Sequence, residues 1–327
     1  MKIHNLHVIK LFSPKFRMWL IATLSLLMVS ACTMETADKK ELRIGTHRWI
    51  GYEPLFLAKS LGHLDEKIKL IEFASASNVM TALKNGTLDG ATLTLDEALV
   101  IQQQGIDLVV TLINDFSNGG DAILLSEKYS KDQSLKGLKI GLDGGSVNAY
   151  VLSRALDLQG LKYDDVTTVQ IKPSEQFEPL KQGLVDGVVT FEPFRSELIK
   201  SGAIEVFNST KIPGEIIDVT VLRTSAIRSQ NELFNNLQRS WFEAVDFIKS
   251  EPEVAFKRIA ERKSFSEENM REGIKLIHLP DREEISENIA SKDGVITNAE
   301  HLMNFMIEKQ LLSDRVDVNK MFTPMLR

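Results

Sequence analysis

The sequence predicts an α/β fold built as two lobes, one inserted into the other. Short β-branched runs alternate with helical patterns through most of the first 225 residues, which is typical of largely parallel sheets with helical crossovers. Two short runs, 122–125 and 219–222, bracket a block of about 95 residues that has its own alternation of strand and helix patterns. We therefore expect two α/β lobes joined by two crossing strands, with a ligand cleft between them.

The individual elements follow from local pattern. Strands are expected where Val, Ile, Leu and Phe gather between clusters of Gly, Asn, Asp and Ser, and helices where apolar residues recur at helical spacing. The expected strands are 42–46, 68–73, 91–95, 108–113, 122–125, 138–142, 166–171, 187–191, 204–207 and 219–222, and the helices between them include 54–60, 78–84, 147–158, 176–182 and 193–200.

After residue 225 the pattern becomes helical. Four segments have a side-chain acceptor followed three residues later by Glu, the spacing of a capping box: 229–232, 264–267, 281–284 and 297–300. We expect four or five helices here, packed back on the first lobe. Lobe 1 is therefore predicted to comprise 41–121 and 223–327, and lobe 2 to comprise 122–222.

The first 31 residues have the composition of an export signal. Four basic residues and no acidic residue occur in 1–17, and about a dozen apolar residues follow. This run is shorter than the roughly 20 residues of a membrane span. Small residues then precede Cys32, so we predict a lipoprotein signal peptide over 1–31, lipidation of Cys32 and a polar tether over 32–40. An ordinary signal peptide that ends near a cysteine is the alternative.

Charge and motif content exclude several classes of function. The formal net charge of the whole sequence is −6, and the first 31 residues carry four positive charges and no negative ones, so the remaining residues carry −10. So acidic a protein is a poor candidate for binding nucleic acid. Cys32 is the only cysteine, so no intrachain disulfide or Cys-based metal site is expected. GxSxG, Walker and GxGxxG motifs are missing, and the histidines are scattered. We predict no catalytic residue, metal or cofactor.

The segment THRWIGY, residues 46–52, is the first candidate binding segment. Trp49 and Tyr52 suit a small ligand with a flat or methylated cationic part, through stacking or cation–π contact. Thr46 and Arg48 lie in the same segment. Packing of Trp49 on the core of its lobe is the alternative.

An aromatic-Glu-Pro corner follows a strand in each lobe, at 52–54 and at 191–193. Because open α/β sheets bind ligands at the carboxyl ends of their strands, we expect the two corners to face one another. Phe191, Glu192 and Arg195 form the second set, and Asp218 lies close to the return crossing. Glu192 or Asp218 is suited to an amine, unless it caps a helix or pairs with Arg195.

Two glycine-containing turns complete the candidate site. The turn at 144–148 follows a strand and opens a helix, so Gly145, Ser146 and Val147 are suited to hold an anion; a plain Ser N-cap is the alternative. The segment 115–121 precedes the first crossing and places Ser117 and Asp121 near the cleft, unless it is a simple glycine turn.

The charge of the ligand stays open at this level. Glu192, Asp218 and Asp121 favour a cationic or amine end, whereas Arg48, Arg195 and the turn at 145–146 favour an anionic one. A zwitterion or a substituted heterocycle satisfies both sets.

Four segments, 43–58, 83–91, 136–146 and 183–193, resemble the solute-binding lipoproteins of ABC importers, within the group that includes taurine, sulfonate, nitrate and thiamine-precursor binding proteins. The resemblance runs from about Leu42 to Leu312. It implies a type II periplasmic-binding-protein fold that closes on one small molecule. By position, it also implies ligand contacts at 46–52, at 145–147, and at Phe191 and Glu192.

The resemblance further implies a setting for the protein. We expect a monomeric lipoprotein of the cell envelope, anchored through Cys32 at the inner or outer membrane and facing the periplasm. It would deliver a zwitterion, amine, sulfonate or pyrimidine-like heterocycle to an ABC permease. A sensor that reports its ligand to a membrane-bound signalling receptor is the alternative. An enzyme of thiamine-pyrimidine synthesis is a more distant one, because the yeast enzymes carry a cysteine-rich iron site that this chain lacks.

Overall fold

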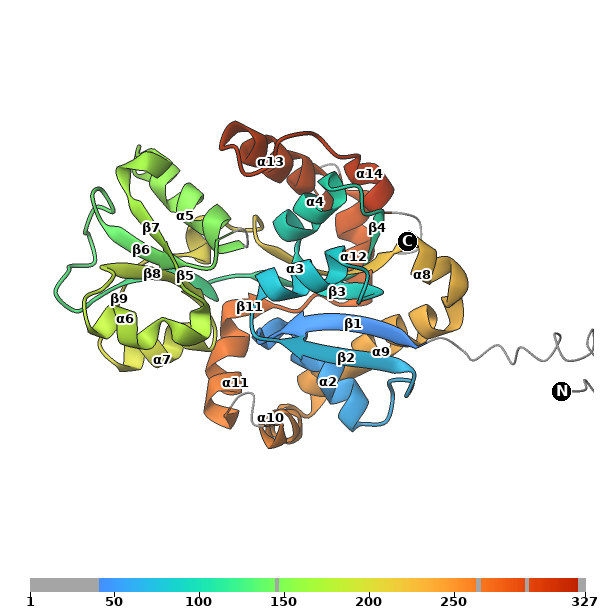
Figure 1. The fold of residues 1–327 in the computed structure, drawn as a ribbon. Helices are drawn as coiled ribbons and strands as arrows, with labels where there is room; N and C mark the ends of the chain where they lie inside the picture. Colours follow the sequence, from blue (N-terminus) through green and yellow to red (C-terminus); the bar gives the residue numbers. More distant parts are fainter. Residues whose placement is uncertain (1–40, 145–146, 263–265, 292–293, 323–327) are drawn as a thin grey trace, which may run out of the picture. The chain divides into compact units, whose positions relative to one another are not determined.

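Two mixed β-sheets with helices on both faces make up the described part of the chain, residues 41–144, 147–262, 266–291 and 294–322 of a computed structural model (Figure 1). The predicted signal peptide and tether, Cys32, Gly145 and Ser146 lie outside these residues. No helix in the described ranges has both the length and the apolar character of a membrane span.

The first sheet has six strands, and with the helices packed on it we call it lobe 1. Its order is β11-β4-β10-β3-β1-β2, in which β1, β2 and β3 are parallel and β10 is antiparallel to both of its neighbours. The strands are β1 (Leu42–His47), β2 (Ile68–Phe73), β3 (Gly90–Thr94), β4 (Leu108–Ser117), β10 (Ile217–Arg223) and β11 (Ile277–His278).

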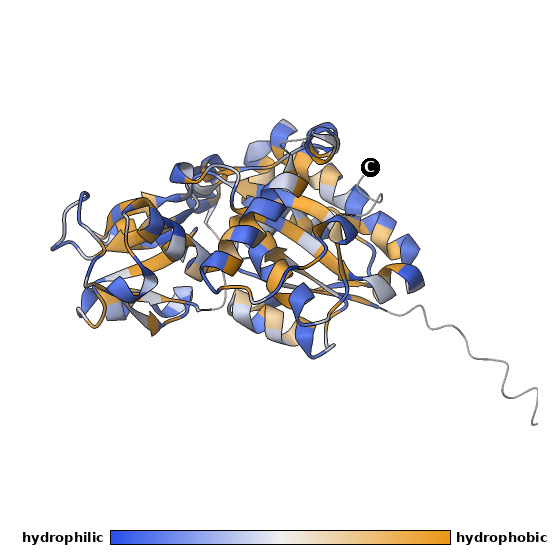
Figure 2. Cartoon of the chain, turned by 90° about the horizontal axis from the view of Figure 1, so that it is seen from above, coloured by the Kyte–Doolittle hydropathy of each residue, from blue (hydrophilic) through white to orange (hydrophobic). Residues whose placement is uncertain are grey.

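Helices cover both faces of this sheet because its strands are hydrophobic on both sides. On one face, Trp241 is fully buried in a cluster with Leu42 and Leu55; on the other, Leu83, Leu99 and Met303 belong to a second cluster. Figure 2 shows hydrophobic residues concentrated along the strands and hydrophilic residues on outer helical faces. The first face carries α2 (Glu53–Ser60), α9 (Asn231–Ser250) and α10 (Pro252–Glu261), and the second carries α3 (Ala76–Lys84), α4 (Leu95–Gln103) and α13 (Val295–Glu308).

The second sheet has five strands in the order β7-β6-β8-β5-β9, and with its helices we call it lobe 2. In Figure 1, α5 lies on one face and α6 and α7 lie on the other. The elements are β5 (Asp121–Leu125), β6 (Lys139–Leu142), α5 (Val147–Leu158), β7 (Thr167–Gln170), α6 (Phe177–Lys181), β8 (Gly187–Phe191), α7 (Phe194–Lys200) and β9 (Ile204–Asn208).

The chain passes between the sheets in two short segments, 118–120 and 209–216. The two strands expected to cross each belong to a single sheet, β5 to lobe 2 and β10 to lobe 1. The Oγ atoms of Ser117 and Ser209 are 2.8 Å apart, and the Gly119 N–H donates to Ser209 Oγ at 2.6 Å. The two passages are therefore tied to each other.

A sequence pattern that occurs once in each lobe sets the register of a central strand. The pattern Leu-Lys-x-Gly-x-x-Asp-Gly occurs at 83–90 before β3 and at 180–187 before β8, although sequence analysis did not recognise it. Asp89 accepts a hydrogen bond from the Arg43 N–H at 2.9 Å, and Asp186 accepts one from the Lys139 N–H at 3.0 Å. Each aspartate thus fixes the start of a central strand against its neighbour.

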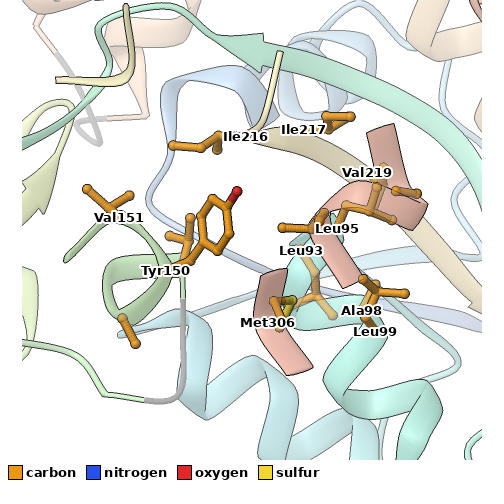
Figure 3. Packing of buried hydrophobic residues seen from close by; sticks show 14 of the residues in the cluster. Leu93, Leu95, Ala98, Leu99, Tyr150, Val151, Ile216, Ile217, Val219 and Met306 are labelled. Carbon is orange, nitrogen blue, oxygen red and sulfur yellow. The ribbon is translucent and has the colours of Figure 1, made fainter. Parts of the chain in front are cut away.

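The lobes also share one apolar cluster. Tyr150 and Val151 of α5 belong to the same cluster as Leu95 of α4 and Met306 of α13. Figure 3 shows the Tyr150 ring pointing toward Leu95 and Ile216. The cluster therefore continues from lobe 1 into lobe 2.

The C-terminal helices differ from the prediction. The described residues after 223 form seven α-helices, namely α8 (Thr224–Ser229), α9, α10, α11 (Glu267–Gly273), α12 (Arg282–Ala290), α13 and α14 (Val318–Met321), and one short 3-10 helix, Ile274–Leu276. Only the start at Asp281 is confirmed, where the Glu284 N–H donates to the Asp281 carboxylate at 3.0 Å. The start at Ser264 lies outside the described residues, and Ser266 caps α11. The starts at Ser229 and Thr297 are wrong, because these residues lie within α8 and α13.

Candidate functional site

A small cavity lies where the carboxyl ends of β1, β3 and β8 meet between the lobes. Its volume is about 10 Å³, which is close to the least that can hold one water molecule. An organic molecule therefore enters only if the lobes move apart or the lining side chains rearrange. The lining residues are His47, Trp49, Ala76, Thr94, Asp121, Asp143, Val147, Phe191 and Asp218.

A larger hollow elsewhere is less suited to selective binding. It has a volume of about 370 Å³ and lies between α5, the segment 213–215 and α13. Its principal charged groups already bind one another, because Glu215 accepts hydrogen bonds from Tyr150 at 2.6 Å and from Arg154 at 2.6 and 3.0 Å. The cavity at the strand ends is therefore the better candidate.

Aromatic rings from both lobes meet at this cavity. The Trp49 and Phe191 ring centroids are 5.8 Å apart at 82°, and the His47 ring lies 5.7 Å from Phe191 and 5.3 Å from Tyr52. These edge-to-face contacts are favourable for aromatic pairs. Trp49 and Phe191, which the sequence placed on opposite lobes, are thus brought together.

Glycines make room for these rings. A Cβ on Gly51 would lie 1.8 Å from Asp115 Oδ2, and a Cβ on Gly120 would lie 2.6 Å from Trp49 Cη2. Trp49 Nε1 donates to Asp115 Oδ2 at 3.1 Å. Any larger residue at either glycine would therefore displace the tryptophan or its partner.

Carboxyl groups dominate the polar part of the lining. Asp121, Asp143 and Asp218 line the cavity, and the Tyr52 hydroxyl donates to Asp218. The pKa of Asp121 is raised to about 7, chiefly by burial and in smaller part by the Asp96 and Glu192 carboxylates, although a hydrogen bond with Ser117 opposes the rise. Burial and the neighbouring Asp115 raise the pKa of Asp218 well above its usual range.

The described lining contains no lysine or arginine. Burial lowers the pKa of His47 to about 4, so its imidazole is neutral at pH 7, and its Nδ1 has no hydrogen-bond partner among the described residues. The Arg48 guanidinium lies 5.3 Å from the centroid of the Phe194 ring. Among the described lining residues, none therefore brings a positively charged side chain to the cavity at pH 7.

The glutamates of the two aromatic-Glu-Pro corners bind arginines. Arg195 donates to Glu192 at 2.9 Å and to Glu205 at 2.6 Å. Arg262 donates to both carboxylate oxygens of Glu53, at 2.9 and 3.0 Å. Pairing with Arg195, which was the alternative to an amine-binding role for Glu192, therefore occurs.

The predicted site residues fall into three groups. Trp49, Asp121, Val147, Phe191 and Asp218 line the cavity. Gly145 and Ser146 lie outside the described residues. The remaining predicted residues do not line it and stay predictions as ligand contacts: Thr46, Arg48, Tyr52, Ser117, Glu192 and Arg195.

Sequence reasoning missed several lining residues, chiefly His47 and Asp143. Asp143 accepts hydrogen bonds from Ser77 Oγ at 2.8 Å and from Gln170 Nε2 at 2.8 Å. Both missed residues stand at or just after the carboxyl end of a parallel strand, which is where α/β sheets place ligands. Their position at the ends of predicted strands was therefore the signal in the sequence from which both residues could have been found.

The stability of the protein should fall as the pH rises through the range set by Asp121. Its pKa is about 7 in the fold and near 3.8 without burial, so the folded state binds the proton more tightly. The free energy of unfolding should therefore decrease from about pH 4 to about pH 7. Asp121→Asn should flatten this decrease without abolishing it, because other buried carboxyl groups remain. Urea denaturation at pH 5 and pH 8 is the measurement, and equal stability of the unaltered protein at both would contradict it.

The chain is similar in sequence to known proteins. The chain matches the model of the NMT1-like family over residues 35–262. It is 28% identical over 194 residues to a putative aliphatic sulfonates-binding protein of Escherichia coli (strain K12), and 24% identical over 191 residues to the taurine-binding periplasmic protein of the same organism. Each match covers 57% of this chain and only 60% and 59% of those relatives' own length.

The fold is shared with solved periplasmic binding proteins. The alkanesulfonate-binding protein SsuA from Xanthomonas axonopodis pv. citri, bound to MOPS, superposes with a TM-score of 0.70 over 84% of this chain and 95% of that one, at 19% identity. The two-lobed fold expected from the sequence is therefore confirmed. With the family model matched over more than half of its residues, the chain belongs to the NMT1-like family.

Proposed function

We propose that the protein captures a small amine-bearing or cationic ring compound between its lobes and delivers it to an ABC permease. The observation that carries the proposal is the cavity lining, which combines three carboxyl groups, two aromatic rings and a neutral histidine without a described lysine or arginine. Carboxylates attract cationic groups and accept N–H hydrogen bonds, and aromatic faces favour cations and flat rings.

This lining narrows the ligand classes that the sequence left open. An alkanesulfonate is an anion and would bring its charge beside Asp121, Asp143 and Asp218. An aminopyrimidine or a similar amine instead offers N–H donors to the carboxyl groups and a flat face to Trp49 or Phe191. The matched relatives support a solute-binding role. The sulfonate and taurine in their names are ligands of those proteins and do not identify the ligand of this chain.

The cellular setting is part of the same proposal. A basic head, an apolar run and small residues before Cys32 support an exported lipoprotein anchored through that cysteine. One matched relative is a periplasmic protein, which supports a location on the periplasmic side of an envelope membrane. We propose that the protein acts there as a monomer.

The ligand class can be tested directly. Mass spectrometry of small molecules released by denaturing the purified protein, followed by thermal-shift assays, should identify amines or aminopyrimidines that raise the melting temperature. Alkanesulfonates of similar size should leave it unchanged. A melting temperature that rises with sulfonates and not with amines would overturn the proposed ligand class.

Trp49→Ala should weaken binding of such a ligand at least tenfold, about 1.4 kcal/mol, because it removes the indole face at the cavity wall. Phe177→Ala is the matched control, since Phe177 is an exposed aromatic residue on lobe 2 away from the cavity. Titration calorimetry measures both affinities. Equal affinity of the Trp49 variant and the unaltered protein would remove Trp49 from the site.

The affinity for a ligand of constant positive charge should rise between pH 6 and pH 8. The pKa of Asp121 is about 7, so the carboxylate that attracts the cation forms across this range, and binding should release a proton. Calorimetry in buffers of different ionisation enthalpy measures that release. Asp121→Asn should weaken binding and reduce its pH dependence, and a flat profile in the unaltered protein would exclude Asp121 as the titrating group.

A further inference from the structure

We propose that Glu97 is a specificity-determining residue, which makes the cleft reject anionic ligands by holding the N-terminal end of α5 with a carboxyl group of the chain itself. This inference rests on the proposed function, because it explains why a member of this family would prefer amines.

The geometry shows one carboxyl group bound to backbone groups of both lobes. Glu97 lies in the first turn of α4 in lobe 1, and its side chain is 1% exposed. Its Oε2 accepts a hydrogen bond from the Thr94 N–H at 3.1 Å, just before α4. Its Oε1 accepts one from the Val147 N–H at 3.2 Å, at the first residue of α5 in lobe 2.

The bond to Val147 occupies one of the N–H groups that an anionic ligand could bind at the start of α5. The first N–H groups of a helix have no partner within the helix and carry its positive end, so they are well suited to bind anions. In α5 this position borders the cavity, because Val147 is one of the lining residues. Since both carboxyl oxygens of Glu97 already accept N–H donors, a sulfonate must displace a buried side chain to reach Val147.

The surroundings add to this exclusion. Asp96 is adjacent in the chain and acts on Glu97 through its charge, while Asp121 and Asp143 line the same cavity. A sulfonate at the start of α5 would lie near all of these groups as well as the displaced Glu97. An amine avoids this conflict, because it does not compete for the Val147 N–H.

The test compares ethanesulfonate with 4-aminopyrimidine as probes in titration calorimetry of the purified protein. Glu97→Ala frees the Val147 N–H and should raise ethanesulfonate affinity at least tenfold over that of the unaltered protein. Glu97→Gln keeps the size of the side chain but places an amide N–H₂ against one of the two N–H donors, so it should give a smaller gain. If the alanine variant does not fold, the gain in ethanesulfonate affinity of the glutamine variant tests the inference.

Two control variants separate this effect from a general loss of charge. Asp96→Asn removes a neighbouring buried acid that does not bond to α5, and Glu66→Gln removes an exposed acid. Both should raise ethanesulfonate affinity less than threefold. An Asp96 variant that gains as much as the Glu97 variants would show that charge alone is responsible and would overturn the inference.

The outcomes separate this inference from the proposed function. If folded Glu97 variants gain no ethanesulfonate affinity, the role of Glu97 is overturned, whereas 4-aminopyrimidine binding by the unaltered protein still supports the proposed function. If the unaltered protein binds ethanesulfonate and not 4-aminopyrimidine, both fail. If the unaltered protein prefers 4-aminopyrimidine and only the Glu97 variants gain ethanesulfonate affinity, the inference and the proposed function are both supported.

Discussion

Two aspartates at the amino ends of central strands fix the register on which the rest of the site depends. Asp89 holds β3 against β1, and Asp186 holds β8 against β6, through the same backbone contacts. Because side chains alternate along a strand, a shift of one residue would turn every side chain to the opposite face. The register at one end of each sheet thus determines which residues reach the cavity at the other.

The cavity is acidic at a cost in stability. Burying a carboxyl group is unfavourable unless hydrogen bonds or pairing compensate, and several carboxyl groups here retain raised pKa values despite such bonds. Trp49 donates to Asp115 and Tyr52 donates to Asp218, so residues in and beside the cavity wall also offset part of the cost of burying these carboxyl groups. Groups kept at such a cost at the carboxyl ends of strands are typical of binding sites.

The fold was predictable from the sequence because its signals are local. Each expected strand overlaps one of β1 to β10, and the predicted helix at 147–158 has the observed bounds. The site was only partly predictable, because pairing depends on residues far apart: Glu53 meets Arg262 across 209 positions, and Glu97 meets Val147 across 50. Capping-box spacing misplaced the starts at Ser229 and Thr297, since a three-residue interval does not show where packing begins a helix.

The apolar cluster that spans the lobes makes their separation sensitive to temperature. Tyr150 and Leu95 are buried in this cluster, so a movement that separated the lobes would expose them to water, and exposure of apolar surface carries a positive heat-capacity change. The hydrophobic contribution to closure therefore weakens on cooling. At low temperature, polar contacts between the lobes would therefore contribute a larger fraction of the free energy of closure.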